Sequence, residues 1–295
     1  MLHFTQRYTY SEFHGGMSKM NRQATTYVIG NFKGGVGKTK TATMLAYEAA
    51  TVFNEKCLLI DMDPQGNATR VLAKTGDIEQ IDKSITDGFL NQNLENEIIP
   101  VIENLDIVPS NTSFRKLSKI LFDMFPEDEL AQITYLKKLL EPLKDKYDRI
   151  YIDVPPTISD YSDNAMIAAD YCIIVLQTQE LSLEGAQTYI AYMQFLAETY
   201  DADLQVLGII PMMLHQGKRV DNKVLQQAQE MYGGNVLNTI VRYQERLKVY
   251  DIEGIHKTIN VSGNVDMWDE KAHQLFIDVL SELNEHENYF ATVNA

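Results

Sequence analysis

A short glycine-rich segment near the N-terminus constrains the fold of this chain more than any other part of its sequence. The segment consists of Lys33, Gly34, Gly35, Val36, Gly37, Lys38 and Thr39. A β-branched and aromatic run over 25–29 precedes it, and a helical pattern with apolar Met44 and Leu45 follows it. A strand, a glycine loop and a helix in this order predict a loop whose backbone N–H groups bind phosphate.

Each residue type in this loop has a physical reason to be there. Glycines let the backbone curl around phosphate oxygens, and a helix beginning near Thr39 adds the positive end of its dipole. We expect Lys38 to lie along the β- and γ-phosphates and the Thr39 hydroxyl to bind Mg²⁺. The alternative is a glycine turn with incidental lysines, which leaves the flanking strand and helix unexplained. The sequence therefore predicts binding of a nucleoside triphosphate.

The loop departs from the ordinary phosphate loop at its beginning. Phe32 occupies the place of the usual first glycine, and Lys33 follows it directly. This second lysine resembles the deviant phosphate loop of the ParA/MinD family of ATPases, in which the early lysine reaches across a nucleotide-sandwich dimer to the partner's phosphates. The resemblance implies a homodimer that forms with ATP and gives Lys33 and Lys38 catalytic roles.

Further segments resemble the same family in the same order along the chain. They are 57–67, 104–111, 147–156 with its double proline, and 170–178. Together with the loop they extend over roughly 25–285, so the resemblance rests on more than one motif. The chain is identified as similar to the ParA-type partition ATPases.

Three aspartates follow apolar runs that we expect to be strands. The resemblance implies that Asp63 is catalytic and orients or activates the attacking water. Asp61 and Asp153, together with Thr39, would hold Mg²⁺ directly or through water, because a hard cation prefers oxygen ligands. The alternative is that Asp61 and Asp63 only cap the turn at 64–66, which is a common role of Asp.

Three further residues are candidates for nucleotide contacts. Lys40 stands where many members of the family have Thr, and it either adds positive charge near the α-phosphate or faces solvent. Pro211 and Met212 end an apolar run at a place suited to an adenine contact, although no chemical feature marks them out.

Apolar runs alternate with helical stretches along the rest of the chain. The runs cover 26–30, 57–60, 105–109, 149–154, 171–176 and 205–210. This alternation predicts a doubly wound α/β fold with a mostly parallel sheet and helices on both faces. The loop and the aspartates then fall at the carboxyl ends of the strands, where such folds bind ligands. We expect residues 1–24 to be an N-terminal extension and 25–295 a single ATPase domain.

The two cysteines, Cys57 and Cys172, lie inside apolar runs. We expect them to be buried and free, as in a reducing cytosol, and their spacing does not suit a metal or an iron–sulfur cluster. The first residues lack the apolar segment of a signal peptide, and no run reaches the length of a membrane span. The expected location is the cytoplasm.

The ATP-bound form is expected to bind either a membrane or DNA. MinD-like relatives bind membranes through a basic amphipathic C-terminal helix. Here the amphipathic stretch 266–287 has Lys271 alone against several Asp and Glu residues on its polar face. An anionic bilayer would repel such a helix, so we expect it to pack on the core. A MinD-like membrane-associated positioning ATPase remains the alternative.

A locally basic region stands out in a chain of net charge −15. Residues 215–257 carry seven Lys and Arg against five Asp and Glu. The resemblance implies non-specific DNA binding there, with Lys218, Arg219, Arg242, Arg246 and Lys248 as the candidates. The alternative is that these residues are scattered over solvated helices.

The resemblance implies the function of DNA partition, with the protein associated with the nucleoid. An ATP dimer would bind DNA, and a ParB-like centromere-binding protein would stimulate slow ATP hydrolysis and so drive plasmid segregation. The acidic surface would attract a basic segment of that partner. Two other classes of enzyme fit less well. A metabolic synthetase or kinase would need its own substrate pocket with polar anchors. A bacterial tyrosine kinase would need a cluster of tyrosines at its C-terminus, whereas this sequence has only one tyrosine, Tyr289, after Tyr250.

Overall fold

The computed structural model describes residues 23–177, 180–213, 219–259 and 263–293. Its strands are β1 (Thr25–Gly30), β2 (Cys57–Asp61), β3 (Ile99–Ile102), β4 (Leu105–Val108), β5 (Arg149–Asp153), β6 (Tyr171–Gln177), β7 (Gln205–Met213) and β8 (Val241–Arg242). They form one sheet in the order β3-β4-β2-β5-β1-β6-β7-β8. Every neighbouring pair is parallel except β3 and β4, which confirms the expected doubly wound, mostly parallel fold.

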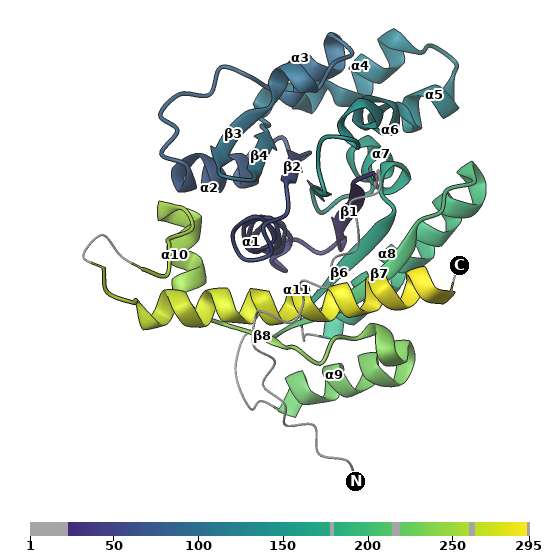
Figure 1. Ribbon diagram of the computed structural model, residues 1–295. Helices are drawn as coiled ribbons and strands as arrows, with labels where there is room; N and C mark the ends of the chain where they lie inside the picture. Colours follow the sequence, from purple (N-terminus) through teal and green to yellow (C-terminus); the bar gives the residue numbers. More distant parts are fainter. Residues whose placement is uncertain (1–22, 178–179, 214–218, 260–262, 294–295) are drawn as a thin grey trace.

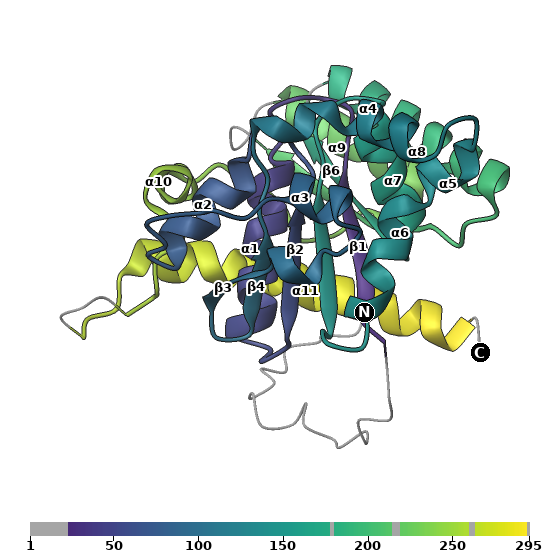
Figure 2. The same cartoon turned by 90° about the horizontal axis from the view of Figure 1, so that it is seen from above.

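Helices cover both faces of this sheet (Figures 1 and 2). They are α1 (Lys38–Thr51), α2 (Asn67–Thr75), α3 (Ile85–Leu90), α4 (Leu117–Met124), α5 (Glu129–Ile133), α6 (Tyr135–Leu140), α7 (Asp160–Ala168), α8 (Glu180–Tyr200), α9 (Arg219–Tyr232), α10 (Glu245–Glu253) and α11 (Met267–Val293). Helices α3 to α9 pack on one face, and α1, α2, α10 and α11 pack on the other.

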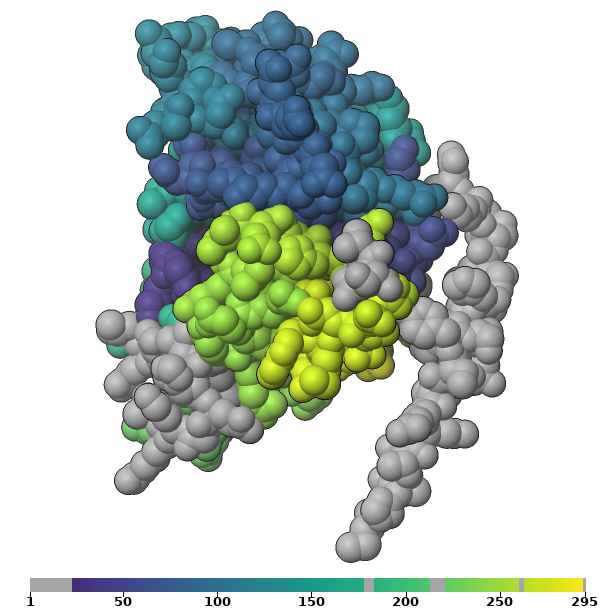
Figure 3. Space-filling view, turned by 90° about the vertical axis from the view of Figure 1, so that its left-hand side faces the viewer, coloured from purple at the N-terminus to yellow at the C-terminus, as the bar shows by residue number. Residues whose placement is uncertain are grey.

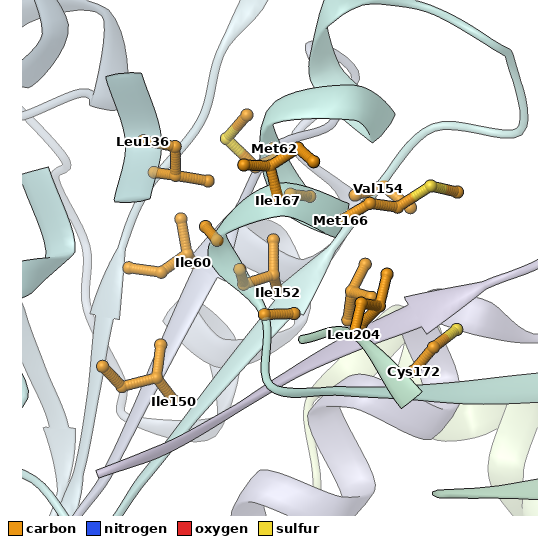
Figure 4. Close-up of a cluster of buried hydrophobic side chains, with 14 of the residues drawn as sticks. Ile60, Met62, Leu136, Ile150, Ile152, Val154, Met166, Ile167, Cys172 and Leu204 are labelled. Carbon is orange, nitrogen blue, oxygen red and sulfur yellow. The ribbon is translucent and has the colours of Figure 1, made fainter. Parts of the chain in front are cut away.

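The two faces bury separate apolar cores because neighbouring residues of a strand point in opposite directions. In β1, Val28 joins the core under α7 and α8, whereas Ile29 joins the core under α1 and α11. Figure 4 shows the first of these cores, with Ile60, Ile152 and Cys172 contributed by three strands. Cys57 is also buried, and both cysteines are free, as expected from the sequence.

Two edge strands do not follow from the apolar pattern. Strand β3 has four residues, includes the exposed Pro100, and pairs antiparallel with β4 across a turn at Asn104, whose φ is 63°. Strand β8 has only two residues. Strands this short carry no apolar run long enough to recognise, and proline is tolerated at a sheet edge.

The structure describes only residues 23 and 24 of the expected N-terminal extension. Residues 1–22 lie outside the described part of the chain. Ala24, which we assign to the extension, is buried and donates its N–H to the carbonyl oxygen of Lys144 at 2.7 Å. The packed structure therefore already includes Ala24.

Helix α11 crosses α1 on this face of the sheet, as Figures 1 and 2 show, and packs on it. Ala272, Phe276, Val279 and Leu283 are buried, which confirms that this amphipathic helix packs on the core. Trp268, which belongs to the same stripe in the sequence, is instead 62% exposed. None of the helices in the described ranges is long and apolar enough to cross a bilayer.

The buried face of α11 predicts a large difference between two aromatic truncations on this helix. Phe276→Ala should lower the free energy of unfolding by about 3–5 kcal/mol, because it removes a ring with no exposed surface and leaves a cavity. Trp268→Ala, the matched control, should change it by less than about 1 kcal/mol. Urea unfolding measures both values, and equal losses would contradict the packing of α11.

Candidate nucleotide-binding site

Residues 31–37 connect β1 to α1 at the carboxyl edge of the sheet, and Lys38 and Thr39 begin α1. Gly35 and Gly37 have φ values of 73° and 99°, in the left-handed region that favours glycine. At Gly37 a Cβ atom would also lie 2.8 Å from Sδ of Met212. Because Gly37 precedes α1 and has no side chain to cap it, the first N–H groups of this helix suit an anion.

Lys38 is the first residue of α1 and is only 6% exposed. Its Nζ donates to the carbonyl oxygen of Lys33 at 3.3 Å, so the two lysines of the loop are in direct contact. Burial lowers the pKa of Lys38, whereas the nearby Asp153 and Asp63 oppose that shift. A cation is thus held beside the loop with carboxylates as counter-charges.

Two of the aspartates meet on neighbouring strands. Asp61 of β2 and Asp153 of β5 are register partners, and neither side chain has exposed surface. Burial raises the pKa of Asp61 to about 6, and burial together with Asp61 raises the pKa of Asp153 well above its usual value. Both oxygens of Asp153 lack a well-formed hydrogen bond, although the Thr39 hydroxyl and the Lys38 ammonium are close enough to lower that pKa.

Asp61 and Asp63 differ from Asp153 because they cap the local turn. Asp61 accepts hydrogen bonds from the Asp63 N–H at 3.1 Å and from the N–H and hydroxyl of Thr69 at 2.8 and 2.7 Å. Oδ1 of Asp63 accepts from the N–H of Gln65 at 2.8 Å. Asp63 therefore caps the turn and Asp61 binds the start of α2. The metal role of Asp61 and the catalytic role of Asp63 stay predictions.

The oxygen donors fit Mg²⁺ bound together with a nucleotide. Among the described residues, no cluster of three or more His, Cys, Asp and Glu side chains provides a complete metal site. Mg²⁺ usually takes one or two protein ligands and completes its shell with phosphate and water. The unpaired carboxylate of Asp153 beside the Thr39 hydroxyl supplies donors of this kind.

Asn31 lies beside the loop, although no motif in the sequence marks it. It is 1% exposed, and its Nδ2 donates to the carbonyl oxygen of Val175 in β6 at 2.9 Å. Its Oδ1 accepts from the N–H of Lys33 at 2.9 Å. Asn31 therefore joins the loop to a neighbouring strand, a contact that no local sequence signal reveals.

The other nucleotide candidates lie on two sides of the loop. Lys40 forms an ion pair with Asp251 of α10 at 2.9 Å, an arrangement that neither sequence interpretation includes. Pro211 and Met212 lie in β7 in register with β6, and Met212 lies against Gly37. Nucleotide contacts of all three remain predictions.

Arg246, the DNA candidate best matched to the family, lies in an intramolecular ion-pair cluster. Its Nε lies 2.7 Å from Oδ1 of Asp269, and its guanidinium also contacts Asp266. Tyr250 donates to the same Asp269 at 2.6 Å. These contacts fasten α10 to the start of α11, so Arg246 has a structural role whether or not it contacts DNA.

The remaining basic candidates differ in accessibility. Arg242 in β8 and Lys248 in α10 are exposed, and the Lys248 ammonium lies 4.8 Å from the ring centroid of Tyr243. Lys218 lies outside the described residues, as does the side chain of Arg219, although α9 begins at that position. Figure 3 shows the surface that α10 and the start of α11 form beside α2.

Comparisons with known proteins show which family this chain belongs to. The AAA domain family matches residues 24–206, more than half of the chain. The sporulation initiation inhibitor protein Soj of Bacillus subtilis is 30% identical over 74% of this chain and 84% of its own length. The chromosome partitioning protein ParA of Myxococcus xanthus is 32% identical over 74% of this chain and 75% of its own length.

One solved structure extends the comparison to nearly the whole fold. A plasmid partition protein from Borrelia burgdorferi, bound to AMPPNP, superposes with a TM-score of 0.70 and 23% identity. The match covers 89% of this chain and 99% of the other. At this identity the similarity concerns the fold alone.

The different hydrogen bonding of the two buried aspartates predicts opposite effects of the same substitution in the nucleotide-free protein. Asp153→Asn should raise the free energy of unfolding by about 1 kcal/mol or more near neutral pH, because folding raises the pKa of the Asp153 carboxyl and a neutral amide does not carry that cost. Asp61→Asn should lower it by about 1–3 kcal/mol, because an amide N–H₂ would face the donors of Thr69 or Asp63.

The pH dependence gives a second check on Asp153. A carboxyl whose pKa is raised on folding costs no stability below its unfolded pKa of about 3.9 and an increasing amount above it. The gain from Asp153→Asn should therefore shrink as the pH falls toward 4. Urea unfolding at several pH values measures this trend, and a pH-independent gain would contradict the titration of Asp153.

Proposed function

The chain belongs to the ParA-type partition ATPases, and we propose that it is an ATP-dependent DNA partition protein that works as a nucleotide-sandwich dimer. The observation that carries this proposal is the loop with two lysines, in which the Lys33 carbonyl holds the buried Lys38 ammonium. One lysine, Lys38, is enough for the phosphates of a single subunit. The presence of a second lysine, Lys33, supports a role toward the nucleotide of a partner subunit.

The residues of one subunit divide the work as follows. The N–H groups at the start of α1 and the Lys38 ammonium bind phosphate oxygens. Thr39, Asp153 and Asp61 would hold Mg²⁺ directly or through water, and the bound ion would neutralise phosphate charge. Asp63 orients the attacking water, and the slow rate expected of a switch fits a site completed only in the dimer.

DNA binding in this proposal depends on dimerisation. Arg242 and Lys248 provide few cations in a chain of net charge −15, so one subunit binds the DNA backbone weakly. Two such surfaces joined by an ATP dimer bind with avidity, because the second contact becomes intramolecular. ATP binding and DNA binding are thereby coupled, and the protein is held on the nucleoid in its ATP form.

The test of this coupling is binding to random-sequence duplex DNA across a salt series. Binding is expected with ATP and Mg²⁺ but not with ADP or without nucleotide. Lys248→Ala should weaken binding and lower the slope of log K against log salt by about two, since the dimer loses two phosphate contacts. Lys137→Ala, an exposed lysine of α6 on the other face, is the matched control.

Arg246→Ala is a poor probe of this surface. The substitution would leave the buried Asp269 without its cation, so any loss of DNA binding would also reflect a loosened α10. If sedimentation confirms the ATP dimer and no nucleotide state binds DNA, the nucleoid model is wrong. A membrane-associated or protein-scaffold role would then replace it.

The proposed release step requires a centromere-binding, ParB-like partner with a basic segment. The acidic balance of this chain favours an electrostatically steered encounter with such a segment. Adding the partner's basic segment as a peptide should raise the rate of ATP hydrolysis in the presence of DNA. The same peptide with its Lys and Arg replaced by Glu should have no effect, and equal stimulation by both peptides would exclude this coupling.

A further inference from the structure

We propose that Phe32 is a positioning residue that holds Lys33, through helix α8, in place for its contact with the partner subunit. This inference rests on the proposed function, because it concerns the lysine that the dimer would use. Phe32 stands where ordinary phosphate loops have glycine. Its half-buried ring packs against the core on the α8 side of the sheet.

The first observation is an aromatic cluster between the loop and α8. The Phe32 ring centroid lies 4.7 Å from that of Tyr189 and 5.7 Å from that of Tyr192. Tyr189 is 1% exposed, so the cluster extends from the loop into the core. Rings at these separations and tilts attract one another in addition to burying apolar surface. The residue that precedes Lys33 is therefore fixed to α8.

The second observation is the close approach of α8 to β1 and to the loop. A Cβ atom at Gly30 would lie 2.3 Å from Cζ of Tyr189, so only glycine allows this ring to lie against the end of β1. At Gly185 of α8, a Cβ atom would lie 3.2 Å from Oδ1 of Asn31 and 3.8 Å from Cβ of Lys33. Helix α8 thus contacts the strand end that enters the loop at several points.

The third observation is that the main chain of Lys33 is held at both of its polar groups. Its N–H donates to Asn31, and its carbonyl oxygen accepts from Lys38. With Phe32 anchored beside it, the rotations that would swing the Lys33 side chain away are restricted from the N-terminal side. A long lysine side chain loses less entropy on contacting a partner when its Cα atom is already in place.

The cluster also reaches the helix that follows Asp153. Tyr192 donates to Oδ1 of Asp163 in α7 at 3.1 Å. Helices α7 and α8 pack together, and Figure 2 shows them side by side. Phe32 therefore belongs to a packed unit that joins the loop of residues 33–39 to α7, the helix after β5. A displacement of α8 would therefore also displace Lys33.

The experiment compares nucleotide binding with turnover in the full chain. Phe32→Ala should lower the rate of ATP hydrolysis at least about tenfold and weaken ATP-dependent dimerisation, because misplacing a reacting group slows chemistry strongly. Binding of a fluorescent ATP analogue by dilute monomer should stay within about threefold, because Lys38, Thr39 and the loop amides make those contacts. Phe122→Ala, an exposed phenylalanine of α4, is the matched control.

Two conservative variants distinguish the effect of the aromatic ring of Phe32 from the effect of its volume. Phe32→Tyr keeps the ring and should restore most of the rate, whereas Phe32→Leu keeps much of the volume and should not. A purely structural role would instead lower the melting temperature, nucleotide affinity and rate together, and would be relieved by leucine as well as by tyrosine. That pattern would overturn the inference, and the leucine and tyrosine variants keep the test decisive if the alanine variant does not fold.

Lys33→Ala separates this inference from the proposed function. If Phe32 acts through Lys33, the double variant Phe32→Ala/Lys33→Ala should be no slower than Lys33→Ala alone. If Lys33→Ala dimerises and hydrolyses ATP normally, the proposed sandwich itself fails. If Lys33→Ala is inactive while Phe32→Ala matches the original protein, only the positioning role is wrong.

Discussion

The burial of opposite charges at the carboxyl ends of three central strands is the constraint on which the rest of the site depends. Lys38 follows β1, whereas Asp61 and Asp153 end β2 and β5, and all three side chains are buried. Burying charge costs free energy unless partners compensate, and Asp153 lacks a well-formed hydrogen bond. The fold tolerates this cost because two large apolar cores surround the strands. A charged ligand that binds there would offset part of the cost of burying these charges.

Helix α1 connects the loop to α10 and α11 through polar side-chain contacts. It begins in the loop, and its Glu48 contacts Nδ1 of His273 in α11 at 2.6 Å. The other ring nitrogen of His273 contacts the carbonyl oxygen of His256 at 2.7 Å. Burial alone would lower the pKa of His273, but the hydrogen bond with Glu48 raises it. Together with the Lys40–Asp251 pair, this contact joins α1 to α10 and α11.

The fold and the phosphate loop are predictable because their signals are local. Alternating apolar runs specify buried parallel strands, and a glycine loop between a strand and a helix specifies phosphate chemistry. The edge strands β3 and β8 are not predictable, since pairing with a neighbour defines them more than their own residues do. Trp268 shows the same limit, because helical periodicity places it on the buried stripe, whereas the structure leaves it 62% exposed and buries the neighbouring Asp269 against α10.

The sequence by itself determined which residues are candidates for the site: the glycine loop with its two lysines and Thr39 follows from residue type and spacing, and the roles of the three aspartates follow from the family resemblance. Only the tertiary structure decided how these residues differ. Thr69 donates to Asp61, whereas Asp153 lacks a well-formed hydrogen bond. Arg246 pairs with α11, and Phe32 packs on α8. Each of these outcomes depends on a contact between segments distant along the chain, and such contacts exist only once the sheet has brought those segments together.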